Sequence, residues 1–142
     1  MTVALHLLDT DTASFVIKGR SPEIKQKLAA IPPDRVCVSA VTRAELMYGL
    51  KPLPPAHRLH IGVRRFLKIV RELAWDADAA DAYAEIRHRL TTTGQPIGEM
   101  DMMIAAHALS LGAVLVTNSM RHFGRIAPPL VLVNWHGGAG AV

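Results

Sequence analysis

The chain has 142 residues, of which half are hydrophobic and 20% are charged, so its composition excludes an intrinsically disordered protein. With 16 Lys and Arg against 12 Asp and Glu, the formal net charge is +4, which permits an anionic partner such as nucleic acid without identifying one. The single cysteine excludes a disulfide framework and multi-cysteine metal sites, and it favours a reducing, cytoplasmic location.

The first half of the chain predicts strands that alternate with helices. Residues 5–8 and 36–40 are short, continuous apolar runs, the pattern of parallel strands that are buried on both faces. Cys37 lies in the second run, and we interpret it as a buried small hydrophobe rather than a nucleophile. A helix is expected to follow this strand, and an apolar stripe from Leu59 to Leu73 predicts another helix.

The second half continues the alternation. Apolar spacing from Ala79 to Leu90 indicates a helix, and a further helix from about Met100 to Leu111 would end at Gly112. Residues 113–117 and 130–134 repeat the pattern of buried strands. No run approaches the ~20 apolar residues of a membrane span, and the first residues lack the features of a signal peptide.

These elements together predict one α/β domain over residues 1–142. We expect a three-layer sandwich in which helices flank a central, mostly parallel sheet. Its core should span about residues 5–135, and residues 136–142 should form a flexible tail.

Acidic residues fall where chemistry gathers in such a sheet, beyond the carboxyl ends of the strands. Asp9 and Asp11 follow the first strand, Glu45 lies in the first turn of the helix after the second, and Asp101 opens the helix before the third. Clustered carboxylates repel one another unless a cation lies between them. Without histidine or cysteine partners they suit Mg²⁺ or Mn²⁺, and such a site indicates metal-assisted attack of water on a phosphodiester.

Each of these acids also has a purely structural interpretation. Thr42 and Glu45 fit a capping box, in which the glutamate accepts from the backbone N–H of the cap residue. Asp101 could complement a helix dipole, and Asp9 and Asp11 could be turn or cap residues. The common location predicted for Asp9, Glu45 and Asp101 favours the functional interpretation over the structural one.

Four segments occur in order that resemble the PIN domain and, within it, the VapC toxins of bacterial toxin–antitoxin pairs. They are LDTDT (8–12), VTRAELMYG (41–49), IGEMDMMIAAHAL (97–109) and LVTNSMRHF (115–123). The resemblance implies a PIN-like sandwich and a Mg²⁺- or Mn²⁺-dependent endoribonuclease that cleaves structured RNA. It further implies a homodimer held inactive by a VapB-type antitoxin. The spacing and the Thr-Asn strand end resemble the group that cuts initiator tRNA in its anticodon loop.

The resemblance also implies roles for individual residues. Asp9 and Asp101 would be the main metal ligands, and Glu45 would bind through water or orient the attacking water. Supporting positions are Thr10, Asp11, Thr117, Asn118 and Ser119. Ser119 stands where many relatives carry a fourth acid, which puts a second metal site in doubt. Asp11 stands where relatives often have asparagine, and we expect it to hydrogen-bond across the site rather than to replace the missing charge.

The sequence also permits two other functions. The segment 9–12 fits the D-x-D-x-T signature of haloacid dehalogenase-type phosphatases, but their mechanism needs a downstream lysine and a further acid pair. No lysine follows Lys68 and no acid follows Asp101, which argues against that reaction. The other alternative is a PIN-fold module that binds RNA or protein without catalysis, and the intact acid trio argues against it.

Several basic residues could contact RNA. Arg64 and Arg65 belong to a basic run that either attracts phosphate or forms the solvated face of a helix, which is the more usual arrangement. Arg121 and His122 lie just past the third strand, nearer the predicted crevice, and could touch phosphate. His107 lies in an apolar run and is predicted to be a satisfied, buried histidine rather than a general base.

Overall fold

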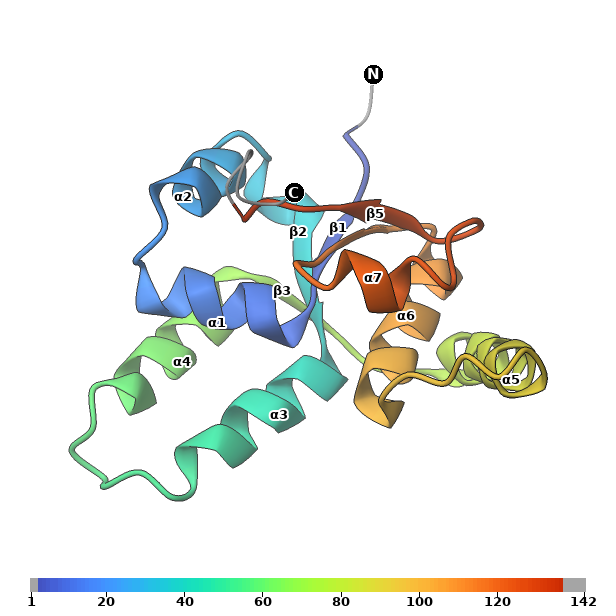
Figure 1. The fold of residues 1–142 in the computed structure, drawn as a ribbon. Helices are drawn as coiled ribbons and strands as arrows, with labels where there is room; N and C mark the ends of the chain where they lie inside the picture. The colour runs from blue at the N-terminus through green and yellow to red at the C-terminus, as the bar shows by residue number, and fades with distance from the viewer. Residues whose placement is uncertain (1–2, 137–142) are drawn as a thin grey trace.

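Five short parallel strands form the centre of the computed structural model, which describes residues 3–136 (Figure 1). The strands are β1 (His6–Leu8), β2 (Val36–Ser39), β3 (Arg71–Leu73), β4 (Val114–Val116) and β5 (Val131–Val133). The helices are α1 (Thr10–Lys18), α2 (Pro22–Ala29), α3 (Ala40–Leu50), α4 (Leu59–Ile69), α5 (Ala77–Thr92), α6 (Glu99–Leu111) and α7 (Met120–Phe123), and a 3₁₀ turn covers Pro33–Arg35.

The strand order is β3-β2-β1-β4-β5, and every pairing is parallel. The central strand β1 pairs through His6 with Val36 of β2 and through Leu8 with Val116 of β4. The prediction of a mostly parallel sheet is therefore confirmed. Each of the four predicted strands is present and one or two residues shorter than the apolar run that indicated it.

Helices cover both faces of the sheet, as Figure 1 shows, with α1, α2 and α4 on one side and α5 and α6 on the other. Successive strand residues point to opposite faces, so Leu7 packs with Leu115 and Ala105 of α6, whereas Leu8 joins Val38 and Phe66 in the other cluster. All six side chains are buried. The expected three-layer sandwich is confirmed.

The edge strand β3 corrects one prediction. The apolar stripe was expected to continue as helix to Leu73, but α4 ends at Ile69 and Val70 is extended, with φ −85° and ψ 155°. Arg71 and Glu72 are exposed, so this strand lacks the continuous apolar pattern that identified the other four. Val70 and Leu73 are three residues apart, which imitates helical spacing.

The first two helices had no apolar stripe assigned to them, although the sequence carries their boundaries. Asp9 caps α1, and Gly19 ends it with a left-handed φ of 64°. Ser21 caps α2, and Pro22 occupies its first turn. Cap residues therefore mark both helices more clearly than periodicity does.

The structure also bears on the ends of the chain and on membrane insertion. In residues 3–136 no helix is both long and apolar enough to cross a membrane. Of the predicted tail, residues 137–142 lie outside the described residues. His136 is not free: its ring packs edge-on against Phe15, with centroids 4.7 Å apart, and its Nε2 lies 3.1 Å from the Thr12 hydroxyl.

Candidate active site

A cavity of about 270 Å³ lies beyond the carboxyl ends of β1 and β2, at the start of α6. It is lined by Asp9, Thr10, Asp11, Glu45, Asp101 and Ser119. The three acids that the sequence singled out, from positions 9, 45 and 101, therefore face one space. Their convergence results from the parallel sheet, which brings the ends of β1, β2 and β4 to one edge.

Asp9 is the most buried of the acids, at 4% exposure. It caps α1, with Oδ1 accepting from the backbone N–H of Thr12 at 2.8 Å. Thr117, at the end of β4, forms a side-chain hydrogen bond with Asp9, and its hydroxyl also accepts from Ser119 N–H at 2.8 Å. Burial raises the pKa of Asp9, and the hydrogen bonds from Thr117 and Thr12 oppose that rise. Asp9 is thus the cap residue of the structural interpretation and a member of the acid cluster.

Asp101 is half-buried in the first turn of α6, where the helix dipole also favours a negative charge. Its pKa is raised, first by burial and then by the negative charges of Asp9 and Glu45. The positive charge of His122 acts in the opposite direction. The acids are therefore close enough to repel one another, as an acid cluster without a cation must.

Glu45 does not belong to a capping box. Helix α3 begins at Ala40 and is capped by Ser39, whose hydroxyl accepts from Val41 N–H at 3.1 Å, so Thr42 lies inside the helix and Glu45 in its second turn rather than its first. The Glu45 carboxylate instead accepts from the hydroxyl of Thr10 at 2.5 Å. The buried hydroxyl of Thr42 lies 3.1 Å from that of Thr10. This contribution of Thr42 is visible only in the structure, because the sequence pattern indicates a cap residue there.

Of the other predicted supporting positions, Asp11 lines the cavity of the acids and Asn118 does not. Asp11 is exposed and faces the cavity, but within residues 3–136 it makes no side-chain hydrogen bond across the site, contrary to expectation. Burial is the main cause of the raised pKa of Asp9 and of Asp101, and the negative charge of Asp11 adds a smaller rise to both. Asn118 does not line the cavity of the acids, and its Oδ1 accepts from Asn134 at 3.4 Å.

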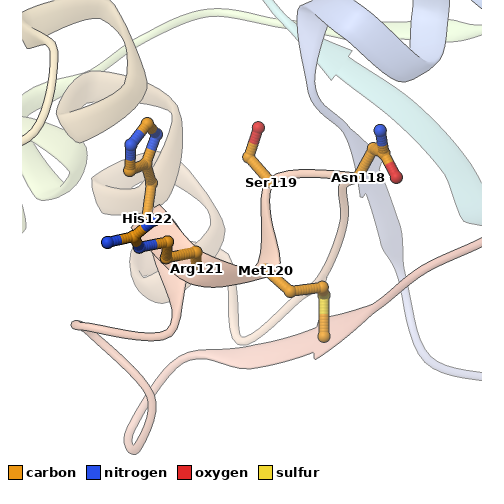
Figure 2. Close-up of a pocket in the computed structure, with 5 residues that line it drawn as sticks. All are labelled: Asn118, Ser119, Met120, Arg121 and His122. Atoms are coloured by element: carbon orange, nitrogen blue, oxygen red, sulfur yellow. The ribbon is translucent and has the colours of Figure 1, made fainter. Parts of the chain in front are cut away.

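A second cavity, of about 450 Å³, adjoins the first and is lined by residues 118–122 (Figure 2). Ser119 borders both cavities. Figure 2 shows the side chains of Arg121 and His122 beside each other on one side of the loop. The predicted location of these two residues beside the crevice agrees with the structure.

Arg64 and Arg65 lie elsewhere, exposed on α4, and neither lines the cavity of the acids. Their helix buries Val63 and Phe66 against α1 and α3, so the part of the basic run that α4 carries lies on its exposed face. The structure therefore does not bring these two arginines to the acids.

His107 is buried, as predicted, and links two helices that carry acids. Its Nδ1 lies 2.8 Å from the hydroxyl of Ser39, the cap of α3, and a ring N–H donates to the carbonyl of Ala74. Burial lowers the pKa of His107. The neutral ring therefore donates to Ala74 and accepts from Ser39, which ties α6 to the start of α3. Cys37 is also buried, as predicted, and burial raises the pKa of its thiol to about 12.

Comparison with known proteins decides the family. The family model of the PIN domain matches residues 7–127. The tRNA(fMet)-specific endonuclease VapC of Salmonella typhimurium is 38% identical over 130 residues, covering 91% of this chain and 96% of its own length. The chain belongs to the PIN-domain family and is a VapC ribonuclease.

Further VapC proteins agree in sequence and in fold. Ribonuclease VapC2 of Haemophilus influenzae is 35% identical over 130 residues, covering 92% of this chain and 97% of its own length. In the crystal structure of DNA-bound VapBC from Salmonella typhimurium, a matched chain is 35% identical, with a TM-score of 0.86 and coverage of 94% of this chain and 99% of its own. These relatives are ribonucleases, and the phosphatase alternative has no support among them.

The donor chemistry of this VapC site fits a hard divalent cation. As the side chains stand in residues 3–136, no three His, Cys, Asp or Glu residues are grouped closely enough to hold a metal ion by themselves. The acids that line the cavity instead offer carboxylate oxygens to an open space. Mg²⁺ is commonly bound in this way, through one or two carboxylates, while it keeps several waters and contacts substrate phosphate.

Proposed function

We propose that this VapC ribonuclease is a Mg²⁺- or Mn²⁺-dependent endoribonuclease whose site is formed by Asp9, Glu45 and Asp101. The observation that carries the proposal is the convergence of these three carboxylates, from distant parts of the chain, on one cavity. The negative charges of Asp9 and Glu45 raise the pKa of Asp101. Repulsion among acids that face open space is relieved when a cation binds between them.

Asp9 and Asp101 would hold the cation, with Glu45 contacting it through water or orienting the attacking water. Bound Mg²⁺ or Mn²⁺ would supply positive charge at the scissile phosphate and lower the pKa of a water molecule. The protein holds two of its carboxylates in fixed orientations: Thr12 N–H and the Thr117 side chain fix Asp9, and Thr10 fixes Glu45. Preorganised groups of this kind reduce the reorganisation that the reaction requires.

Positive groups beside the acids would receive the RNA backbone. Arg121 and His122 line the adjoining cavity, so a phosphate that enters there meets the guanidinium of Arg121 and the imidazole of His122 next to the carboxylates. Arginine suits this task because its planar group forms two parallel hydrogen bonds with phosphate.

The proposed substrate is structured RNA, with the anticodon loop of initiator tRNA as the specific target. The name of the Salmonella relative, tRNA(fMet)-specific endonuclease, supports this choice at 38% identity. Sequencing the RNA ends that accumulate after brief expression without an antitoxin would test it. Ends at one position of the anticodon loop are expected, and ends confined to another tRNA or to ribosomal RNA would contradict the target while leaving the nuclease activity intact.

A VapB-type antitoxin is the proposed partner, and a homodimer in the cytoplasm is the proposed state. Similar solved structures are VapBC complexes, which supports the partner. Co-expression with a cognate VapB-type antitoxin should yield a stable complex that lacks nuclease activity. Sedimentation of the free protein should give twice the mass of one chain, and a monomer at micromolar concentration would contradict the dimer.

Cleavage of total tRNA by the purified, antitoxin-free protein tests the catalytic proposal. Activity should require Mg²⁺ or Mn²⁺, disappear with a chelator and disappear in Asp101→Asn. Glu99→Gln is a matched control, because Glu99 lies in the same turn of α6 but pairs with Arg87 at 3.0 Å and does not line the acid cavity. Metal-independent cleavage, or a folded Asp101→Asn with full activity, would contradict the proposal.

A further inference from the structure

A third cavity, of about 460 Å³, lies between the C-terminal half of α3 and the start of α4. Its apolar wall includes Met47, Leu50 and Leu53. Its polar lining consists of Lys51, His60 and Arg64, and no acid lines it. We call this space the α3–α4 cavity. It is separate from both cavities at the acid cluster, because it shares no lining residue with either.

Within residues 3–136, the polar side chains that line the α3–α4 cavity have no hydrogen-bond or ion-pair partner. Nε2 of His60 is buried and makes no hydrogen bond to any residue that the structure describes. The ion pairs found within residues 3–136 join Arg43 to Glu72 and Arg87 to Glu99, so Lys51 and Arg64 take part in neither. A buried polar atom without a partner is destabilising and calls for a ligand or water that satisfies it.

The charge around the cavity has one sign. Between His57 and Arg71 the chain holds five arginines and lysines and no acid: Arg58, Arg64, Arg65, Lys68 and Arg71. Lysine and arginine side chains carry donors and no acceptors, so the lining groups select a ligand that is an acceptor and an anion. Phosphate has both properties.

We propose that the α3–α4 cavity binds a backbone phosphate of the RNA substrate, at a position away from the cleaved bond. This inference rests on the proposed endoribonuclease function. Glu45 and Lys51 are six residues apart on and just past α3, a spacing of about 9 Å along a helix axis. Figure 1 shows that α3 runs from the end of β2 to the connection with α4. The acid cluster and the α3–α4 cavity therefore lie at different levels along the same helix, and the proposal is that one RNA strand contacts both.

The two neighbouring arginines of α4, Arg64 and Arg65, differ in their relation to the α3–α4 cavity. Arg64 lines the cavity beside His60, whereas Arg65 does not. The sequence alone does not distinguish the two, because both belong to the same basic run. The specific contact is therefore assigned to Lys51, His60 and Arg64, and the other cations contribute only a general positive field.

Binding of a fluorescein-labelled anticodon stem-loop of initiator tRNA tests the inference. All proteins carry Asp101→Asn to prevent cleavage, and fluorescence anisotropy is measured over a range of salt concentrations. Arg64→Gln and Lys51→Gln should each weaken binding by about tenfold, as loss of a hydrogen bond to a charged group does. Each should also reduce the slope of log K against log salt by about 0.7 to 0.9, the value for one phosphate contact.

Lys68→Gln is the matched control, because Lys68 is exposed on the same helix and does not line the cavity. It should change RNA affinity by less than about twofold. Equal losses in Lys68→Gln, Lys51→Gln and Arg64→Gln would overturn the inference in favour of diffuse attraction by the whole basic face. Unchanged affinity in all three would overturn it as well.

His60→Leu separates binding from stability. It removes the unpartnered nitrogen, so the free protein should melt at the same or a higher temperature, while RNA binding weakens. A variant that loses stability and keeps its RNA affinity would overturn the inference, since His60 would then be structural. If the cavity variants lost affinity for the antitoxin but not for RNA, the site would belong to the protein partner, which also overturns it.

Failure of the inference can be told apart from failure of the proposed function. The binding measurement needs no cleavage, so a wild-type protein that binds the stem-loop but never cuts it would contradict only the proposed chemistry. A protein that cuts tRNA with metal while Lys51→Gln and Arg64→Gln bind it normally would contradict only the phosphate site.

Discussion

The hydroxyl of Thr10 donates to the Glu45 carboxylate at 2.5 Å, across 35 positions of sequence. Because that proton goes to Glu45, the Thr42 hydroxyl, 3.1 Å away, is the donor to Thr10. Two hydroxyls thus form a short chain that ends on one carboxylate of the acid cluster. Glu45 is oriented by the first residue of α1, which directly follows Asp9.

Removing the Thr10 hydroxyl should impair turnover more than substrate binding. Thr10→Val keeps the size of the side chain but frees Glu45, and we expect kcat to fall about tenfold with KM nearly unchanged, because orientation of a catalytic group acts on the chemical step. The free energy of unfolding should fall by only about 1 kcal/mol. Thr10→Ser retains the hydroxyl and should restore most of kcat. Full activity in the valine variant would show that Glu45 needs no support from Thr10.

The dual role of Asp9 can be resolved with two substitutions. Asparagine caps helices about as well as aspartate, so Asp9→Asn should keep the bond to Thr12 N–H, and it removes a carboxylate whose pKa burial has raised. Asp9→Ala loses the cap and should destabilise the protein by about 1 kcal/mol in urea denaturation. Neither variant should cleave tRNA. If the asparagine variant were as unstable as the alanine variant, the cap would not explain the burial of Asp9.

The sequence predicted the frame of this site better than its internal contacts. Continuous apolar runs identified β1, β2, β4 and β5, and the edge rule for parallel sheets then located the acids. The edge strand was missed because Arg71 and Glu72 are exposed and carry no strand pattern.

The contacts that the sequence did not predict inside the site depend on distant parts of the chain. Both Ser39 and Thr42 are suitable cap residues, and the choice between them depends on where β2 ends, which local sequence does not specify. The bonds from Thr10 to Glu45 and from Ser39 to His107 join residues 35 and 68 positions apart, so no periodicity can reveal them.

Asp101→Asn should separate metal binding from stability. Without metal, the asparagine variant should be as stable as the wild type or more stable, because it removes a carboxylate whose pKa is raised by burial and by the charges of Asp9 and Glu45. Mn²⁺ at about 100 times its Kd should stabilise the wild type by about 2.7 kcal/mol, which corresponds to a rise in Tm of several degrees.

The same addition of Mn²⁺ should leave the Tm of Asp101→Asn nearly unchanged, whereas Glu99→Gln should respond like the wild type. Differential scanning calorimetry measures both effects. An equal rise in Tm for wild type and Asp101→Asn would place the cation elsewhere.

His107 should make stability depend on pH in the range where ordinary histidines titrate. Burial lowers the pKa of His107 below its ordinary value of 6.5, so the unfolded chain binds a proton more readily than the folded one. Its contribution to stability is complete above that ordinary value and is lost as the pH falls toward the lower pKa of the folded state. The free energy of unfolding should therefore decrease between about pH 7 and about pH 5.

His107→Gln should flatten this dependence, because glutamine can hydrogen-bond to Ser39 or Ala74 but does not titrate. His88, which is exposed on α5, provides the matched control: His88→Gln should keep the wild-type slope. Urea denaturation at a series of pH values gives the slopes directly. A wild-type slope in His107→Gln would mean that the ring takes up its proton equally well in the folded and unfolded states, and the neutral bridge between α6 and the start of α3 would then be wrong.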